Sequence, residues 1–137
     1  LEMRGSDTGP WARLCALPAF WVGLLYDSKS LDAAWELIRN WSSDERENLY
    51  REVPETGLRA KVKGASVRDI ALQVLEISSD GLSRRAKLDD NGKDETMFLD
   101  PVKEIAQSGI TPAERLLESF HTDWDCDINK VFSEQSY

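Results

Sequence analysis

The segment from Trp11 to about Asp27 constrains the fold of this 137-residue chain more than any other feature. Apolar side chains occur on nearly every side of it, and its longest uncharged run, Leu14 to Tyr26, contains Pro18 and Gly23. That run is too short to cross a bilayer, which needs about 20 apolar residues. A helix that is apolar all round is typical of a buried core element. We therefore expect a central buried helix, kinked at Pro18 and with Trp11 in the core.

Capping residues predict where several other helices begin. Ser42 and Glu45 have the spacing of a capping box, in which each side chain bonds the backbone N–H of the other. Thr111-Pro112-Ala113-Glu114 combines an N-cap Thr, a Pro at the first helical position and a Glu at the third. Ser66 is expected to cap a longer helix that contains Gly81. Each of these signals depends on residues only a few positions apart.

Two further expectations concern the helices between these caps. A second helix should begin at Ser30, and its buried stripe should consist of apolar residues at helical spacing: Leu31, Ala34, Trp35 and Ile38. The helix that Ser42 caps should end before Pro54, because proline lacks the backbone donor that a helix interior uses.

The fold class is therefore mainly α, with about six helices and few signals for strands. The exception is Leu1 to Arg4, which can end a strand before the turn-rich run Gly5 to Pro10. A lone strand leaves backbone groups unpaired, so its sheet should lie in sequence upstream of this chain. We divide the chain into residues 1–10, a strand end and turn, and residues 11–137, a helical domain.

Composition narrows the classes of partner. The formal net charge is −8, with 41% hydrophobic and 31% charged residues, which indicates a soluble globular protein. A nucleic acid or an anionic membrane needs a basic face, so we expect neither as a partner. No signal peptide precedes the helices, and we expect a cytoplasmic location. The two cysteines should both be reduced, Cys15 buried and Cys126 more exposed; one histidine, His121, makes a His/Cys metal cage improbable.

Glu2-Met3-Arg4 is the strongest candidate for chemistry. Residues two apart in a strand point to the same face, so Glu2 and Arg4 would project together. A carboxylate is a good Mg²⁺ ligand, and a guanidinium binds phosphate oxygens as a fork. This pair suits a site that handles Mg²⁺ and a transferring phosphoryl group. A solvated ion pair on a frayed terminus is the alternative.

Longer stretches of the sequence resemble a known family. The runs Leu1 to Trp11 (Leu-Glu-Met-Arg-Gly-Ser-Asp-Thr-Gly-Pro-Trp) and Arg13 to Asp27 closely resemble the plant and proteobacterial type of glutamate–cysteine ligase. Thr111 to Glu118 and Val131 to Tyr137 are similar to the closing part of that family. The resemblance covers essentially the whole chain, which would be the helical C-terminal region of a larger α+β ligase with a strand remnant at its N-terminus.

The resemblance implies a reaction and roles for two residues. In that family ATP phosphorylates the γ-carboxylate of glutamate, and the amine of cysteine attacks the resulting acyl phosphate, which begins glutathione synthesis. Glu2 resembles a Mg²⁺ ligand, and Arg4 resembles a catalytic contact to the γ-phosphate or glutamyl phosphate. Glutamate, cysteine and ATP would bind only in the full-length enzyme, in the cytoplasm or, for a plant protein, the plastid. The chain alone is then expected to be inactive.

Two other functions remain open at this level. The chain could be a helical interaction or scaffold module without catalysis, for which the charge imbalance and five tryptophans give some support. It could also belong to a related carboxylate–amine ligase with another acceptor amine, because these residues do not fix the acceptor.

Overall fold

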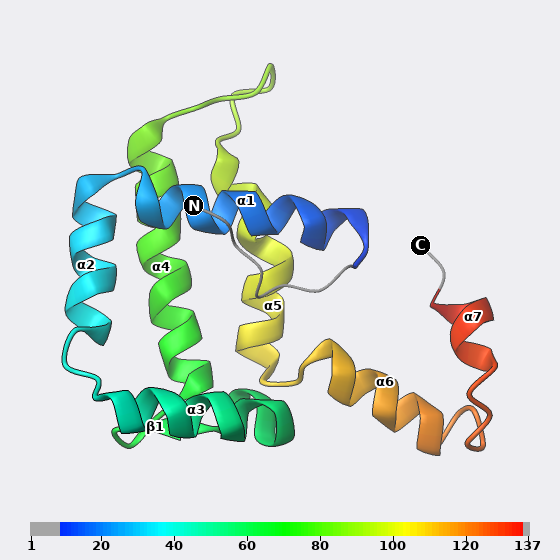
Figure 1. The fold of residues 1–137 in the computed structure, drawn as a ribbon. Helices are drawn as coiled ribbons and strands as arrows, with labels where there is room; N and C mark the ends of the chain where they lie inside the picture. Colours follow the sequence, from blue (N-terminus) through cyan, green and yellow to red (C-terminus); the bar gives the residue numbers. More distant parts are fainter. Residues whose placement is uncertain (1–8, 136–137) are drawn as a thin grey trace.

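The protein is a bundle of helices in the computed structural model, which describes residues 9–135 (Figure 1). This confirms the mainly α fold class. A short antiparallel hairpin pairs Lys61 with Ser66 and Val62 with Ala65. The elements in chain order are α1 (Trp11–Leu25), α2 (Ser28–Ile38), α3 (Ser43–Thr56), the 3₁₀ turn η1 (Gly57–Arg59), β1 (Lys61–Val62), β2 (Ala65–Ser66), α4 (Val67–Arg85), the 3₁₀ turn η2 (Glu95–Leu99), α5 (Asp100–Ser108), α6 (Pro112–His121) and α7 (Lys130–Glu134).

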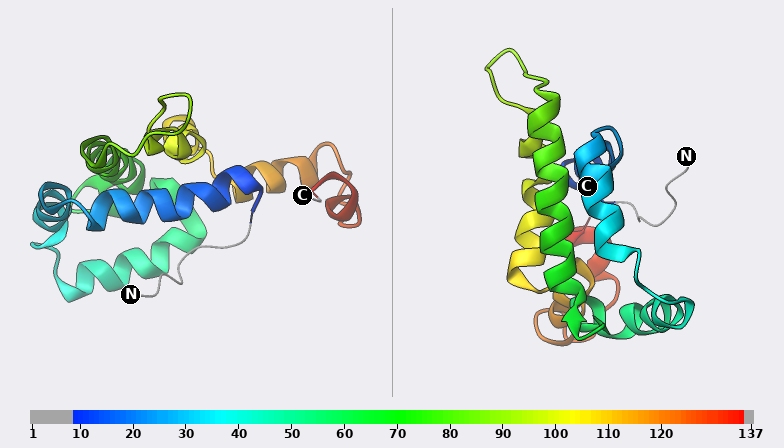
Figure 2. Two further views of the ribbon diagram at one scale, coloured as in Figure 1. Left: turned by 90° about the horizontal axis from the view of Figure 1, so that it is seen from above. Right: turned by 90° about the vertical axis from the view of Figure 1, so that its left-hand side faces the viewer.

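Helix α1 lies across α2, α4 and α5 rather than parallel to them (Figure 1). It packs on α4 and α5, which run side by side, while α2 packs against both α1 and α4 (Figures 1 and 2). Helix α3 crosses near the start of α4, and α6 and α7 lead away from this body toward the C-terminus (Figure 1). The core between α1, α4 and α5 contains Ala19, Leu75, Leu82, Leu99 and Ala106.

Two glycines allow α1 and α4 to approach closely. A Cβ added to Gly81 would lie 1.9 Å from the carbonyl oxygen of Gly23, and one added to Gly23 would lie 2.3 Å from that of Ser78. Both hydroxyls at this crossing are satisfied: Ser78 donates to Phe20 O at 2.9 Å, and Ser30 donates to Ile77 O at 2.9 Å. Gly81 is therefore retained inside a helix because only a residue without a side chain fits there.

The predicted capping boxes are confirmed. The Ser42 hydroxyl accepts from Glu45 N at 3.2 Å, and the Glu45 carboxylate accepts from Ser42 N at 2.8 Å. Ser66 caps α4 by accepting from Asp69 N at 3.1 Å. The third predicted cap, Thr111, begins α6 and is described below with the cavity that this helix borders.

The beginning of α2 and the end of α3 differ from the predictions. Asp27, not Ser30, is the N-cap of α2, because its carboxylate accepts from Ser30 N at 2.8 Å. Helix α3 does not end before Pro54; it continues to Thr56 and ends at Gly57, whose φ is 57°. Proline near the C-terminal end costs one backbone hydrogen bond, which the rest of this helix tolerates.

Burial follows the sequence pattern poorly on two helices. The expected buried stripe of α2 faces outward, with Leu31 45% and Trp35 59% exposed, and the buried contact of this helix is made by Ser30 instead. Helix α1 is buried only along one side, and Trp11 is 78% exposed rather than in the core. On α2, a helical period shows which residues share a face but not which face meets a partner. On α1, apolar side chains all round the helix do not show that the chain supplies a partner for every side.

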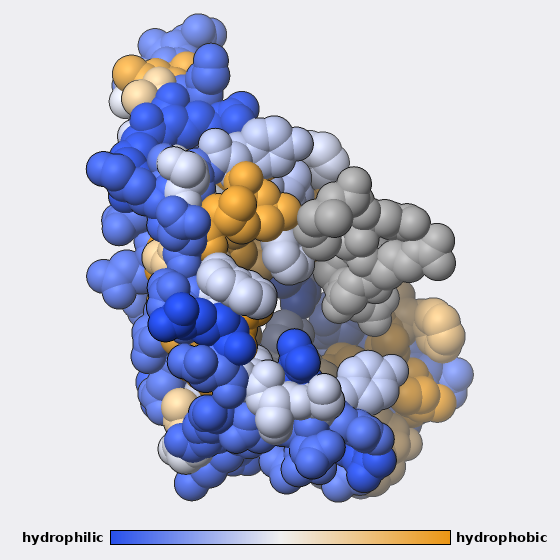
Figure 3. Space-filling model, turned by 60° about the vertical axis from the view of Figure 1, so that its left-hand side comes forward, coloured by the Kyte–Doolittle hydropathy of each residue, from blue (hydrophilic) through white to orange (hydrophobic). Residues whose placement is uncertain are grey.

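The surface combines a charged majority with apolar areas. Figure 3 shows apolar atoms gathered in the middle of one face, with hydrophilic side chains around them. Large side chains with exposure of more than a third include Leu14 on α1, Trp35 on α2 and Tyr50 on α3. Over the described part of the chain, no helix has the length and apolar character that a membrane span requires.

Candidate functional site

The predicted site residues Glu2 and Arg4 lie outside the described residues, and the roles given to them stay predictions. The described chain begins at Gly9. Pro10 is the N-cap of α1, and its carbonyl accepts from Arg13 N at 2.8 Å and from Leu14 N at 3.1 Å. Pro10 also lines a surface cavity, so the start of the described chain borders that cavity.

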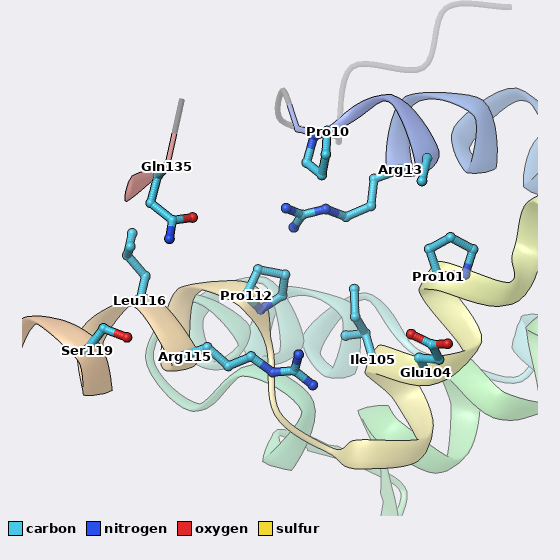
Figure 4. A pocket seen from close by; sticks show the side chains of 11 residues that line it. Pro10, Arg13, Pro101, Glu104, Ile105, Pro112, Arg115, Leu116, Ser119 and Gln135 are labelled. Atoms are coloured by element: carbon cyan, nitrogen blue, oxygen red, sulfur yellow. The ribbon is translucent and has the colours of Figure 1, made fainter. Parts of the chain in front are cut away.

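The cavity lies between the first turn of α1, the exposed side of α5 and the start of α6 (Figure 4). Its volume is about 380 Å³, which is in the range of small-molecule sites. Two guanidinium groups and one carboxylate border it, Arg13 from α1, Arg115 from α6 and Glu104 from α5. Ser119 and Gln135 add uncharged polar groups.

Arg13 is placed by the first turn of α1 and by a glycine. Gly9 is buried, and a Cβ added to it would lie 3.5 Å from Arg13 Nε. The arginine side chain therefore lies beside Gly9. Figure 4 shows that it extends into the cavity. Arg13 also borders a second, apolar cavity of about 380 Å³, whose lining includes Leu17 and Phe20. The aliphatic part of the Arg13 side chain borders the apolar cavity, and its guanidinium group borders the polar one. This limits the positions that the guanidinium group can take.

Arg115 is positioned by the way α6 begins. The Thr111 hydroxyl accepts from Glu114 N at 3.2 Å, and Thr111 N donates to the Glu114 carboxylate at 2.8 Å, which confirms the predicted capping box. Arg59, from η1, forms an ion pair with the same carboxylate. The hydrogen bonds from Thr111 and then the Arg59 guanidinium lower the pKa of Glu114 to about 2, so this anchor is ionised at neutral pH.

The C-terminal end of helix α5 is held in place by a side chain of α4. Arg68 on α4 donates from Nε to Ala106 O at 2.9 Å and also bonds Gln107 O, at the C-terminal end of α5. Gly109 follows with φ of 72°, which turns the chain toward α6. The start of α6 and the end of α5, which border the cavity, are thus each tied to another element.

The charges at this cavity are not neutralised within the described residues. Arg39, Arg51, Arg59, Arg84 and Arg85 form ion pairs with carboxylates. No such ion pair of Arg13 or Arg115 occurs within residues 9–135, although Glu104 borders the same space. The lining carries two positive charges and one negative charge in a chain of net charge −8. A local cationic site of this kind favours an anion, because guanidinium forks pair with carboxylate or phosphate oxygens.

The described residues do not by themselves suggest a metal centre. Within residues 9–135, no group of three or more His, Cys, Asp or Glu side chains is arranged to hold an ion. The Mg²⁺ prediction therefore depends on Glu2, which lies before this part of the chain. His121 and Cys126 are both exposed, with Nδ1 and Sγ 3.8 Å apart, and Cys15 is half-buried; the expected order of exposure of the two thiols is correct.

Sequence reasoning assigned no site role to Arg13 or Arg115. The two residues are far apart in the chain, and neither belongs to a spacing pattern typical of a binding motif. Only the crossing of α1 over α5 brings the first turn of α1 near α6 (Figure 4). No local signal in the sequence would have linked them.

The fold and the cavity thus define a helical protein region with a surface cavity that two guanidinium groups and one carboxylate border. Residues 1–134 match the family model described as glutamate-cysteine ligase family 2 (GCS2). The chain belongs to this family, as its resemblance to plant and proteobacterial glutamate–cysteine ligases indicated.

Curated relatives extend this match over the entire chain. Glutamate–cysteine ligase A, chloroplastic, of Oryza sativa subsp. indica is 49% identical over 137 residues, which are 100% of this chain and 27% of that protein. The chloroplastic enzymes of Medicago truncatula and Arabidopsis thaliana are each 47% identical over the whole chain, which covers 26% and 25% of them. The chain therefore spans about a quarter of the length of these relatives.

Proposed function

We propose that this chain is part of an ATP-dependent ligase that joins the γ-carboxylate of glutamate to the amine of cysteine. The observation that supports this most is the family match over residues 1–134, which includes both Glu2 and Arg4. The relatives are named glutamate–cysteine ligases, and each is about four times as long as this chain. The proposal therefore concerns the full-length protein, and the chain alone would be inactive.

The proposed reaction has two steps. The γ-carboxylate of glutamate attacks the γ-phosphorus of ATP, which gives γ-glutamyl phosphate and ADP. The amine of cysteine then attacks the acyl carbon, phosphate leaves, and the amine loses a proton as the amide forms. Mg²⁺ would neutralise the phosphate charges during transfer. In this proposal Glu2 helps to hold the ion, and Arg4 binds the phosphoryl oxygens through its guanidinium fork.

A conservative substitution at Arg4 tests the assignment in the full-length enzyme. Arg4→Lys keeps the positive charge but loses the planar fork, so kcat should fall about 10²-fold or more. The measurement is phosphate release that requires both glutamate and cysteine. Arg46→Lys, on α3, is the matched control and should leave turnover unchanged. Near-normal turnover of Arg4→Lys would remove this residue from the site.

The division into residues 1–10 and 11–137 belongs to the same proposal. The first part would end a strand of the catalytic sheet, and the second would be the helical domain that supports it. Limited proteolysis of the full-length enzyme would test the division. A protected segment that begins near Trp11 supports it, and protection that begins well inside α1 contradicts it.

The acceptor amine needs its own test, because an enzyme of this chemistry with another acceptor remains the second candidate. Turnover of the full-length protein should be measured with cysteine and with other amines in its place. Dependence on cysteine supports the first candidate, and preference for another amine supports the second. Localisation is also a proposal: the relatives are named chloroplastic, and a cytoplasmic or plastid location can be read from a fluorescent fusion.

A non-catalytic helical module is the candidate from a different class. It is favoured by the exposed aromatic side chains, with Trp11 78% and Tyr50 83% exposed. In the ligase proposal the same side chains would contact the rest of the longer protein. Absence of glutamate-dependent ATP hydrolysis in the full-length protein would support the module.

A further inference from the structure

The described chain leaves much apolar surface uncovered. Within residues 9–135, only three large apolar side chains are fully buried, those of Leu82, Leu99 and Trp124. In the same part of the chain, 16 large hydrophobic side chains are more than a third exposed. A soluble protein rarely exposes extended apolar areas unless something binds to them. This region therefore has contact surfaces for groups outside the described residues.

The apolar cavity that Arg13 borders is a hollow in this surface. Leu17 and Phe20 line it from α1, Val74 lines it from α4, and Val102 and Ile105 line it from α5. All five side chains are half-buried, so the chain itself leaves this hollow partly open. Its volume is about 380 Å³. An apolar cavity of about 150 Å³ already accommodates a benzene ring, so this one can take more than one large apolar side chain.

The polar cavity of Figure 4 adjoins the apolar one, because Arg13 and Ile105 border both. No carboxylate forms an ion pair with Arg13 or Arg115 within residues 9–135. A group that lies across both cavities would meet an apolar hollow at one end and two guanidinium groups at the other. A polypeptide segment with apolar side chains next to carboxylates has this combination.

From this arrangement we propose that the two cavities form one docking surface for a segment of the full-length polypeptide that lies outside residues 1–137. The segment places apolar side chains in the apolar cavity and carboxylates against Arg13 and Arg115. This inference rests on the proposed function only in that the chain is part of a longer protein. The chain covers 27% and 25% of two relatives, so roughly three quarters of such a protein lies outside it.

Other occupants fit the two cavities less well. A second copy related by a two-fold axis would bring the same surface against itself, and Arg13 and Arg115 would then face the same positive charges. A small anion would pair with the arginines but would leave the apolar cavity uncovered. A segment of the same polypeptide also has the advantage of a high effective concentration, because it is covalently connected to this surface.

Photo-cross-linking of the full-length protein identifies the occupant of the apolar cavity. With p-benzoylphenylalanine in place of Val74, the excited ketone takes a hydrogen from a nearby C–H group, the two carbons join, and the ketone becomes an alcohol. We expect a cross-link, at the mass of a single chain, to a peptide outside residues 1–137. A product of twice that mass would assign a second copy instead. Cross-links only to peptides within residues 1–137, or none, would also overturn the proposal.

Two further positions control this measurement. The same probe in place of Gln73, an exposed neighbour on α4 that does not line the cavity, should lose this cross-link. Leu116 lines the polar cavity and is 36% exposed, so it accepts the bulky probe even where Val74 does not. The probe in place of Leu116 should reach the same segment. A melting temperature close to that of the wild type shows that each variant is folded.

A carbodiimide tests the charged part of the surface. Arg115→Lys keeps the positive charge and supplies an amine, which attacks a carboxylate that the carbodiimide has activated; an amide forms, and the carbodiimide leaves as the urea. We expect the substituted lysine to be joined to an Asp or Glu outside residues 1–137. Arg51→Lys is the control and should be joined to Glu47, the ion-pair partner of Arg51 on α3. A link from position 115 only to Glu104, or no link, would contradict the proposal.

The outcome is separable from the ligase proposal. The cross-links are read in the full-length protein without glutamate, cysteine or ATP, whereas ligase activity is read as turnover. If turnover is found without the cross-links, only the inference about the docking surface fails. If the cross-links are found without turnover, only the ligase proposal fails, because docking requires a longer polypeptide but no catalysis.

Discussion

The two ends of α1 differ in what they contact. At the C-terminal end, Gly23 lies so close to α4 that a side chain at Gly81 would collide with its carbonyl oxygen. At the N-terminal end, Arg13 faces a cavity and has no carboxylate partner among the described residues. One helix therefore has a tightly packed end that fixes its direction and an open end that holds a charge in place. We therefore expect that a substitution that disturbs the packing at the C-terminal end of α1 also displaces Arg13 at its N-terminal end.

Gly81→Ala should give the largest effect on stability. In an uncrowded helix this change would stabilise by about 1 kcal/mol, because alanine is the better helix former. Here the new Cβ would lie 1.9 Å from Gly23 O and 2.7 Å from Ser30 Oγ, so the helices must separate. We expect a loss of about 3 kcal/mol, the upper part of the usual range for overpacking. Urea unfolding of both proteins measures the difference.

Gln73→Ala is the control for this prediction, since Gln73 is an exposed residue of the same helix. It should change the free energy of unfolding by less than about 0.5 kcal/mol. A Gly81→Ala variant as stable as the control would mean that the crossing of α1 and α4 is looser than described.

Thr111→Ala should have an intermediate effect and should act on the open end. It removes the hydroxyl that accepts from Glu114 N, and loss of such a cap typically costs about 1 kcal/mol. Ser42→Ala removes the equivalent cap of α3 and should cost about the same. Only Thr111→Ala should also shift the amide NMR signals of Arg115 and Ser119, which line the cavity and follow this cap on α6. Equal shifts at these two amides in both variants would mean that the cap does not position Arg115.

The pH dependence of stability gives the smallest expected effect and probes the packed end. The Arg84 guanidinium, followed by the hydrogen bond from Ser30, lowers the pKa of Asp27 from 3.8 to about 2. A carboxylate whose pKa is lower in the folded state stabilises the fold above the unfolded value. This contribution is complete above about pH 4 and disappears as the pH falls toward 2.

Asp27→Asn isolates that contribution. The difference in urea midpoint between wild type and Asp27→Asn should be largest at pH 5 to 7 and should narrow as the pH falls below about 4. Asp32→Asn, at an exposed position of α2, is the control and should follow the wild type at every pH. A constant difference for Asp27→Asn from pH 7 to pH 3 would mean that its ionised form does not stabilise the N-terminus of α2.

Sequence reasoning predicted the helices well and their buried faces poorly. The starts of α3, α4 and α6 were correct because the capping side chains bond backbone groups only three residues away. The outward orientation of Trp35 was missed, because apolar residues at helical spacing do not tell whether a partner lies within the chain. The small hairpin β1–β2 was also missed, since strands of two residues each are too short for a period to be seen.

The sequence by itself determined the helical composition, the capping boxes and the membership in the glutamate–cysteine ligase family. These properties depend on short-range hydrogen bonds or on matches read along the chain, and neither depends on how the helices cross. The tertiary structure alone decided that Arg13 and Arg115 share a cavity and that Gly81 meets Gly23. Such pairs are set by the angle at which helices cross, and that angle results from side-chain packing over the whole core.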